Sequence, residues 1–303
     1  MVDSHDSLGD RMKAYEELST SRQLMPNCTV YARIDGRAFH TFCKGLKKPY
    51  SMAFIEGMQE VCKYLVFETG AILGYVQSDE ISLGWVDYSK APFEGRVQKL
   101  ESVLASMASA KFVHWIEESK SGGHHVNDGV DKLWDHANIH LPTFDCRIFN
   151  VPSMVELANA FLWRENDAIK NSITGMALHF FSHKDIQGKS GEEKIAMMKE
   201  KGYDFYRDTD EAFLRGTFYH RENFLKDLTN DEVAKIPEKY RRNLVHDAGN
   251  MASNHYACWR SHIVAMNLPY RLTDTKDLVT VLFENGIPML NKDNPTFMLD
   301  VKE

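Results

Sequence analysis

A short run of strand-forming residues that ends in an acidic turn constrains the fold of this chain more than any other feature. Residues 28–34 read Cys-Thr-Val-Tyr-Ala-Arg-Ile, and Asp35-Gly36 follows directly. This β-branched and aromatic run predicts a strand, and Asp-Gly predicts a turn. A strand that ends in Asp-Gly is common, so its meaning depends on what the rest of the sequence places beside it.

Other predicted elements surround this strand in a regular order. They are a helix over 6–24, the strand 28–34, a helix that begins after Ser51, strands 71–77 and 80–86 joined by Ser78-Asp79, a helix over 93–118 and a strand over 144–151. From residue 28 onward the order is βαββαβ. This order predicts a mixed α/β (α+β) fold with a four-stranded antiparallel sheet and two helices on one face, the ferredoxin-like architecture. In that topology Asp35 and Asp79 become neighbours.

The residues beyond Pro152 predict an appended, mostly helical region. A helix over 154–176 places Arg164, Asp167 and Asn171 on one face. A further helix is expected near 191–201, whereas coherent periodicity weakens after residue 205.

Composition narrows the class of protein. The chain has 303 residues, of which 43% are hydrophobic, enough for a sizeable core. It contains no run of eighteen apolar residues and begins with polar residues, so we expect a soluble cytoplasmic protein. Its five cysteines are scattered without a C-x-x-C pair, which favours free thiols over disulfides or structural zinc. Because the net charge is −7, any polyanion would have to bind on a local basic face.

The two acidic turns predict a catalytic site. Asp35 and Asp79, with Glu80 beside the second, could hold two Mg²⁺ ions and a triphosphate if they meet at adjacent strand ends. The carbonyl of Gly36 is a possible further ligand, and the backbone amides of residues 37–40 could face phosphate oxygens. The alternative is that both acids are ordinary turn residues, which composition alone would favour.

Several basic residues are weaker candidates, because solvated surface is the commoner role for each. Lys48 could face a terminal phosphate, while Arg96, Lys99 and Arg147 could form a basic rim for RNA. Gly188-Lys189-Ser190 fails the Walker A pattern because residue 183 is a histidine. His124-His125 is interpreted as a solvated loop, and Lys239, Arg241 and Arg242 as a helix surface.

Taken together, these pieces resemble the family of tRNA(His) guanylyltransferases and Thg1-like 3′–5′ RNA polymerases, and the bacterial and phage-type proteins in particular. The matching segments, in chain order, are Arg33 to His40, Tyr75 to Ser82, the helix with Phe93, Arg96, Lys99, Leu100, Ser102 and Ser106, Phe144-Asp145 with Arg147, Trp163-Arg164 with Asp167 and Asn171, and Leu214 to Thr217. No single segment would suffice, but the ordered set is specific.

The resemblance implies a polymerase-type palm and a role for each site residue. Asp35, Asp79 and the Gly36 carbonyl would bind two Mg²⁺ ions, and Glu80 would support them as a catalytic residue. The nucleotide would contact Asp35, Gly36, Arg37, Ala38, Phe39, His40, Ser78 and Asp79, with Lys48 near its triphosphate. Arg96, Lys99, Arg147 and Asn171 would contact RNA or phosphate.

The resemblance also implies the reaction, the partners and the domains. ATP would activate an RNA 5′-monophosphate, or an existing 5′-triphosphate would serve, and the 3′-OH of GTP or another NTP would then attack it. The partner would be a tRNA 5′ end, and the assembly a homotetramer. Residues 1–152 would be the palm, and 153–303 a helical and irregular region that completes it and contributes to RNA binding and oligomerisation.

One departure bears on the substrate. Where the eukaryotic enzymes carry a His-Ile-Asn-Asn-type segment, this chain has Ile169-Lys170-Asn171-Ser172, in which only Asn171 matches. Templated 5′-end repair of tRNA is therefore favoured over addition of G at position −1 of tRNA(His). Two other interpretations stay open: a palm-type nucleotidyl cyclase, and a non-catalytic RNA-binding protein with an inherited nucleotide pocket.

Overall fold

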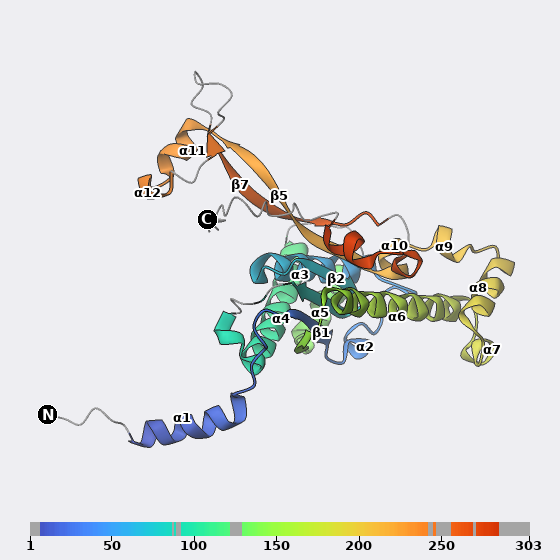
Figure 1. Cartoon of the computed structure of the whole chain (residues 1–303). Coiled ribbons are helices and arrows are strands. Elements are labelled where there is room, and N and C mark those ends of the chain that lie inside the picture. Colours follow the sequence, from blue (N-terminus) through green and yellow to red (C-terminus); the bar gives the residue numbers. More distant parts are fainter. Residues whose placement is uncertain are drawn as a thin grey trace.

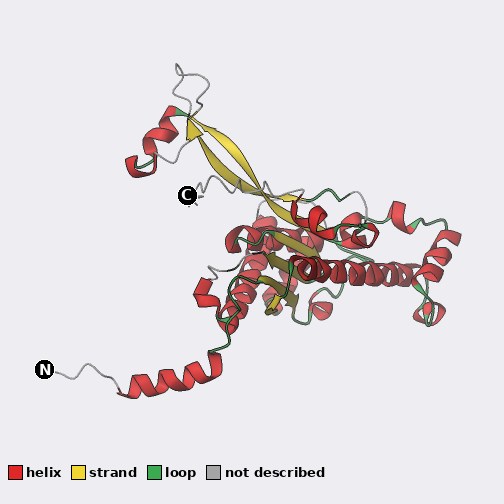
Figure 2. Ribbon diagram, in the orientation of Figure 1, coloured by secondary structure: helices red, strands yellow, loops and turns green. Residues whose placement is uncertain are grey.

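A computed structural model describes residues 7–86, 88, 92–121, 129–241, 245–246, 256–268 and 271–284. Its centre is an antiparallel sheet (Figure 2), built from β1 (Thr29–Gly36), β2 (Leu73–Gln77), β3 (Glu80–Trp85), β4 (Phe144–Val151), β5 (Thr217–Leu228), β6 (Val245–His246) and β7 (Tyr256–Ala265). The strands lie in the order β4-β1-β3-β2-β5-β7-β6. The first four form the ferredoxin-like arrangement, so the predicted fold class is confirmed.

Helices predicted from apolar spacing cover one face of this sheet. α3 (Met52–Thr69) and α4 (Val97–Ser121) pack there with α5 (Gly129–Ile139), which the sequence analysis did not predict. A short η1 turn (Pro92–Gly95) precedes α4. Their buried side chains include Met58, Leu65, Leu104, Phe112 and Ile116, which pack against strand residues such as Ile34 and Ile81 in one cluster. This layer is the main hydrophobic core.

The opposite face of the sheet is covered by α6 (Met154–Phe180), the long helix at the centre of Figure 1. It begins at Ser153, whose side chain accepts a hydrogen bond from the amide of Glu156. The ring of Phe161 packs edge-on to Tyr31, with centroids 5.5 Å apart. Because α6 lies on the face opposite α3 and α4, the sheet is sandwiched between two helical layers.

Shorter elements complete the described chain. They are α1 (Ser7–Thr20), α2 (Phe39–Phe42), α7 (His183–Ile186), α8 (Gly191–Glu200), α9 (Phe205–Asp208), α10 (Glu211–Arg215), α11 (Asn230–Lys235), α12 (Glu238–Arg241), η2 (Leu272–Asp274) and η3 (Thr280–Glu284). The helices predicted over 6–24 and 191–201 are thus present as α1 and α8. Within the described ranges, no helix combines the length and the apolar content needed to cross a membrane.

A long β-hairpin extends the palm sheet, and the sequence analysis did not predict it. β5 pairs with β2 from Val76↔Thr217 to Leu73↔His220, and from Tyr219 to Leu228 it pairs with β7. Beyond β2 the hairpin projects from the body of the molecule (Figure 1). The outer part of β5, from Arg221 to Asp227, is mostly exposed and polar, so it lacks the apolar alternation by which a strand is recognised in a sequence.

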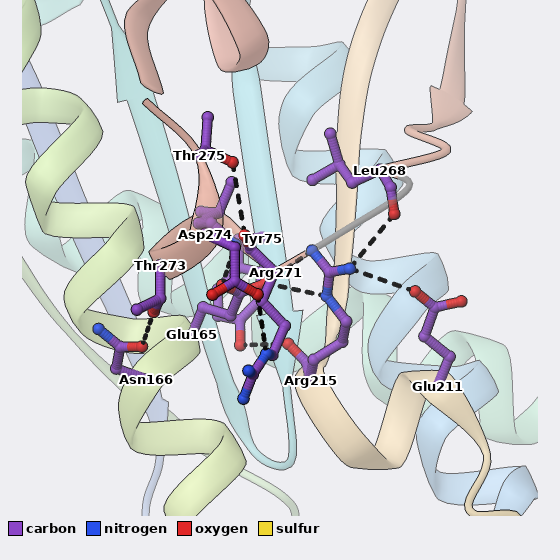
Figure 3. Close-up of polar contacts among 11 residues, drawn as sticks. Tyr75, Glu165, Asn166, Glu211, Arg215, Leu268, Arg271, Thr273, Asp274 and Thr275 are labelled. Carbon is purple, nitrogen blue, oxygen red and sulfur yellow. Dashed lines mark hydrogen bonds and ion pairs between the residues drawn. The ribbon is translucent and has the colours of Figure 1, made fainter. Parts of the chain in front are cut away.

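A buried ion pair joins α6 to the C-terminal segments (Figure 3). Glu165 is fully buried, and one of its carboxylate oxygens accepts a hydrogen bond from Nε of Arg215 at 2.9 Å. Its other oxygen accepts the amide of Leu272 at 2.8 Å. Arg215 in turn reaches the carbonyl of Leu268, and its own carbonyl accepts the hydroxyl of Tyr75. The contacts of Glu165 and Arg215 thus tie α6, α10, β2 and η2 together.

We expect Arg215→Met to lower the free energy of unfolding by about 3–5 kcal/mol, because it leaves the carboxylate of Glu165 buried without its cation. Arg207→Met is the matched control, since Arg207 is 71% exposed and its pair with Asp208 contributes little. Urea unfolding followed by circular dichroism measures both variants. Equal losses in the two variants would contradict the role assigned to the buried pair.

Candidate active site

Three carboxylates lie in a row across the sheet. Asp35 on β1 stands directly opposite Glu80 on β3 and directly opposite Asp145 on β4. Directly opposed residues of antiparallel strands project from the same face of a sheet, which here is the face that α6 covers. We call Asp145, Asp35 and Glu80 the acidic row. The sequence analysis placed Asp145 only in a matching segment, because the register of β4 against β1 cannot be read from spacing.

A basic row lies beside the acidic row, two residues away from it on β1 and on β4. Arg33 on β1 stands opposite Arg147 on β4. Nε of Arg33 lies 3.6 Å from a Glu80 oxygen. The guanidinium of Arg164, supplied by α6, donates to Glu80 from above and also contacts Asp167 at 3.2 Å. Alternation of side chains along each strand therefore sets acids and arginines side by side.

Asp79 approaches the acidic row from the turn between β2 and β3. The turn has only Ser78 and Asp79 as central residues, as predicted, and Ser78 adopts a positive φ of 53° that usually favours glycine. The carbonyl of Asp79 accepts the amide of Gly36 at 2.9 Å. This bond ties the hairpin to the end of β1 and brings Asp35 and Asp79 together, as the topology predicted.

The electrostatics of the site reflect carboxylates held close to one another. Burial raises the pKa of Asp79, and the Asp35 carboxylate raises it further, whereas a hydrogen bond from Ser78 acts in the opposite direction. Burial and the Asp145 carboxylate likewise raise the pKa of Asp35 against the lowering effect of Arg33. Burial also raises the pKa of Glu80, although the pair with Arg164 opposes it. Asp35 and Asp79 thus repel each other.

The segment after β1 folds back over the strand end. A Cβ at Gly36 would lie 2.5 Å from the ring of Phe39, which is buried among other aromatic side chains, so glycine is required there. The amide of Arg37 donates to the carbonyl of Thr143 and is therefore already engaged. Among the described residues, the amides of Ala38, Phe39 and His40 have no backbone partner. Three of the four amides predicted to face phosphate are thus available.

A cavity of about 310 Å³ opens beside Asp79. Its polar lining includes His40, Lys48, Ser78 and Asp79, and Phe39 and Phe54 contribute apolar surface. Burial raises the pKa of the Cys43 thiol to about 12, and of the two nearby charges the Asp79 carboxylate raises it further while Lys48 lowers it. The structure therefore brings Lys48 to the same cavity as Asp79, as predicted. The cavity has the size of a small-molecule site.

The other predicted contacts are more dispersed. Arg96 and Lys99 are exposed at the start of α4, and Lys99 lies over the ring of Phe93. Asn171 is exposed on α6 and donates to Asp167. Their contacts with RNA stay a prediction, as does that of Arg147. Ser190, in the rejected Walker A segment, caps α8. His124-His125 and Arg242 lie outside the described residues.

The donor set suits a cation that arrives with a phosphate ligand. Within the described part of the chain, no three His, Cys, Asp or Glu side chains are arranged to hold a metal ion. Mg²⁺ commonly takes only one or two protein carboxylates and completes its shell with water and substrate phosphates. The repelling pair Asp35 and Asp79, with the Gly36 carbonyl next to the first, fits that pattern.

A ferredoxin-like sheet with carboxylates at its strand ends defines a palm-type α/β protein, and comparison with known proteins gives its family. The sequence profile of the Thg1 family, described as tRNAHis guanylyltransferase, matches residues 9–152. The chain belongs to this family of nucleotidyltransferases.

The solved structures that resemble this chain include two bacterial tRNA(His) guanylyltransferase (Thg1)-like proteins. One, in complex with ATP, is 38% identical and superposes with a TM-score of 0.60. The match spans 70% of this chain and 88% of the bacterial chain. The other, in complex with GTP, is 30% identical over 86% of this chain and 91% of its own, with a TM-score of 0.58. The tRNA(His) guanylyltransferase of Schizosaccharomyces pombe is 27% identical, covering 70% of this chain and 79% of the relative.

We expect Asp79→Asn to stabilise the metal-free protein at pH 7.5 by up to about 1 kcal/mol, or roughly 2–4 °C in thermal midpoint, because it removes a buried charge that faces Asp35. A carboxyl group whose pKa folding raises stabilises the folded state at low pH and loses that contribution as pH rises through the folded pKa. The gain should therefore shrink toward pH 4.

Thermal unfolding in EDTA at the two pH values measures this effect. Asp135→Asn, at an exposed position on α5, serves as the control and should leave the midpoint unchanged at both. A gain in Asp79→Asn that is the same at pH 4 and pH 7.5 would show that charge repulsion is not its cause.

Proposed function

We propose that this protein adds nucleotides to the 5′ end of tRNA in the 3′–5′ direction, as a Mg²⁺-dependent nucleotidyltransferase. The observation that carries the proposal is the meeting of Asp35 and Asp79 beside a cavity that also contains Ser78 and Lys48. Two similar structures, both of bacterial Thg1-like proteins, are complexes with ATP and with GTP, which supports nucleoside triphosphates as substrates.

The metal ligands follow from the donor set. Asp35, Asp79 and the Gly36 carbonyl would hold two Mg²⁺ ions, which neutralise phosphate charge and activate an attacking oxygen when bound. The repulsion between the two carboxylates would be relieved by the cations, so the site is built for charged ligands. Glu80 would support the site from a position fixed by Arg164 and Arg33.

The remaining contacts would orient the nucleotide. The free amides of Ala38, Phe39 and His40 and the ammonium group of Lys48 could bind triphosphate oxygens. Asp79 and Ser78 line the same cavity, so the sugar of the bound NTP would lie near the carboxylates. Its 3′-OH would then attack the 5′-phosphate of an RNA end that carries a triphosphate or has been activated with ATP. Pyrophosphate would leave from a 5′-triphosphate end, or AMP from an end that ATP has adenylylated, and the chain would grow at its 5′ end.

The α6 helix favours templated repair over an obligatory addition of G to tRNA(His). Ile169 occupies the position of the histidine in the eukaryotic segment, and it is 7% exposed within a cluster that includes Ile173, Met176 and Leu214. This position therefore packs the protein and presents no polar group to RNA. Asn171, which does match, is exposed on the same helix.

A 5′-extension assay tests the proposal. Labelled tRNA that lacks its first nucleotide is incubated with ATP, GTP and Mg²⁺, and we expect the wild type to extend it by one nucleotide or more. EDTA should abolish extension. Asp79→Ala should slow extension by about 10³-fold or more, because it removes a ligand that holds charge-neutralising ions.

Asp135→Ala is the matched control and should extend normally. Failure of the wild type to extend any tRNA would refute the proposed function. Equal rates in Asp79→Ala and wild type would instead refute the assignment of the site. Parallel reactions without RNA, analysed for cyclic nucleotides, test the cyclase alternative.

A further inference from the structure

A second cavity, of about 570 Å³, shares a loop with the first one. Residues 47–51 contribute to both cavities. The rest of the second lining comes from the start of α5, the C-terminal end of α6 and the segment around α9, namely Gly129, Lys132, Met176, His179, Tyr203 and Asp208, together with Phe180. We call it the lysine cavity.

The polar groups of the lysine cavity are mostly cationic or neutral. Lys47, Lys48 and Lys132 are all exposed, and only Lys132 makes a hydrogen bond, to the carbonyl of Gly45 at 2.8 Å, among the contacts of the described chain. The one carboxylate of the lining, Asp208, receives two hydrogen bonds from the guanidinium of Arg207, at 2.7 and 2.9 Å. The cavity therefore carries a net positive charge.

Aromatic rings also line the cavity, among them those of His179, Phe180 and Tyr203. Phe180 and Tyr203 lie with ring centroids 5.0 Å apart, and the hydroxyl of Tyr203 is held by Thr209 at 2.9 Å. His179 lies edge-on to Phe180 at 5.2 Å. Lysines and aromatic rings in one lining are a combination that binds single-stranded nucleic acid, because the ammonium groups meet phosphates while the rings stack on bases.

We infer that the lysine cavity binds an unpaired nucleotide of the RNA substrate, next to the catalytic cavity. This inference rests on the proposed function, because the RNA that would bind here is the substrate of that function. A free NTP fits the site less well, because an NTP arrives as its Mg²⁺ complex and the single carboxylate here is already bound to Arg207. A phosphodiester brings one negative charge per nucleotide and no metal ion, which suits lysines alone.

The test uses a pair of residues that line the lysine cavity and not the catalytic one. In the double variant Lys132→Gln/His179→Ala the glutamine keeps a donor for the Gly45 carbonyl but removes the charge. Binding is measured by fluorescence anisotropy in EDTA, without NTP, using labelled RNA hairpins with and without an unpaired 3′ extension. The control is Lys111→Gln/His114→Ala, a matched pair on α4 outside this cavity.

We expect the wild type and the control to bind the extended hairpin more tightly than the blunt one. In Lys132→Gln/His179→Ala this preference should fall about 5–10-fold, and the slope of log affinity against log salt should fall by about 1. Phe180→Leu should reduce the preference while leaving the salt slope unchanged, because it removes a stacking surface and no charge.

An unchanged preference in both cavity variants would overturn the inference. So would weakened binding of Mg²⁺-ATP together with unchanged RNA binding, because the occupant would then be a free nucleotide. Thermal midpoints close to that of the wild type exclude misfolding as the cause of a loss. Since binding is measured without turnover, a wild type that shows the RNA preference but never extends tRNA would refute the proposed function alone.

Discussion

The carboxylate of Glu165 fixes how α6 lies on the sheet, and the candidate site depends on that position. Its neighbour Arg164 contacts Glu80 in the acidic row, while Glu165 itself contacts Arg215 and the amide of Leu272. Adjacent residues of a helix point about 100° apart, so these two sets of contacts hold α6 against rotation from different sides. A buried charge is costly unless every oxygen is paired, and here both oxygens are. The same pair anchors η2 and the start of β5 against the palm. Segments far apart in the sequence therefore support the sheet near the candidate site.

Two of the three side chains in the acidic row are paired with arginines of the basic row or of α6. Glu80 is paired with arginines, and Asp145 is half-exposed beside Arg147, so each end of the acidic row has a cation. Asp35 lies between them and faces Asp79 as well, and neither of these two acids has an ion pair among the described residues. The two acids without an ion pair are thus the two expected to bind metal. Active sites commonly hold such unfavourable contacts, which a bound ligand relieves.

The sequence predicts the part of this molecule in which local pattern and topology agree. The run ending at Asp35 and the turn at Ser78-Asp79 carry strong local signals, and the βαββαβ order then leaves one common way to pair the strands. The partners of the acidic row were harder to see, because Asp145 joins it through cross-strand register and Arg164 through the rotation of α6. The β5–β7 hairpin was missed because the outer part of β5 is mostly polar and β7 shows no regular alternation of apolar and polar residues. The lysine cavity is assembled from segments far apart in the chain, so no local pattern could reveal it.

The loop over residues 47–51 gives the two cavities a physical connection. Lys48 and Tyr50 line both, and Tyr50 also stacks on Phe213 with ring centroids 4.5 Å apart. Because this loop lines both cavities, a ligand that shifts it in one cavity changes the shape of the other. Coupling between two binding sites is reciprocal, because the free energy by which one ligand alters the affinity of the other is the same in both directions. RNA in the lysine cavity and a nucleotide beside Asp79 would therefore raise or lower each other's affinity equally.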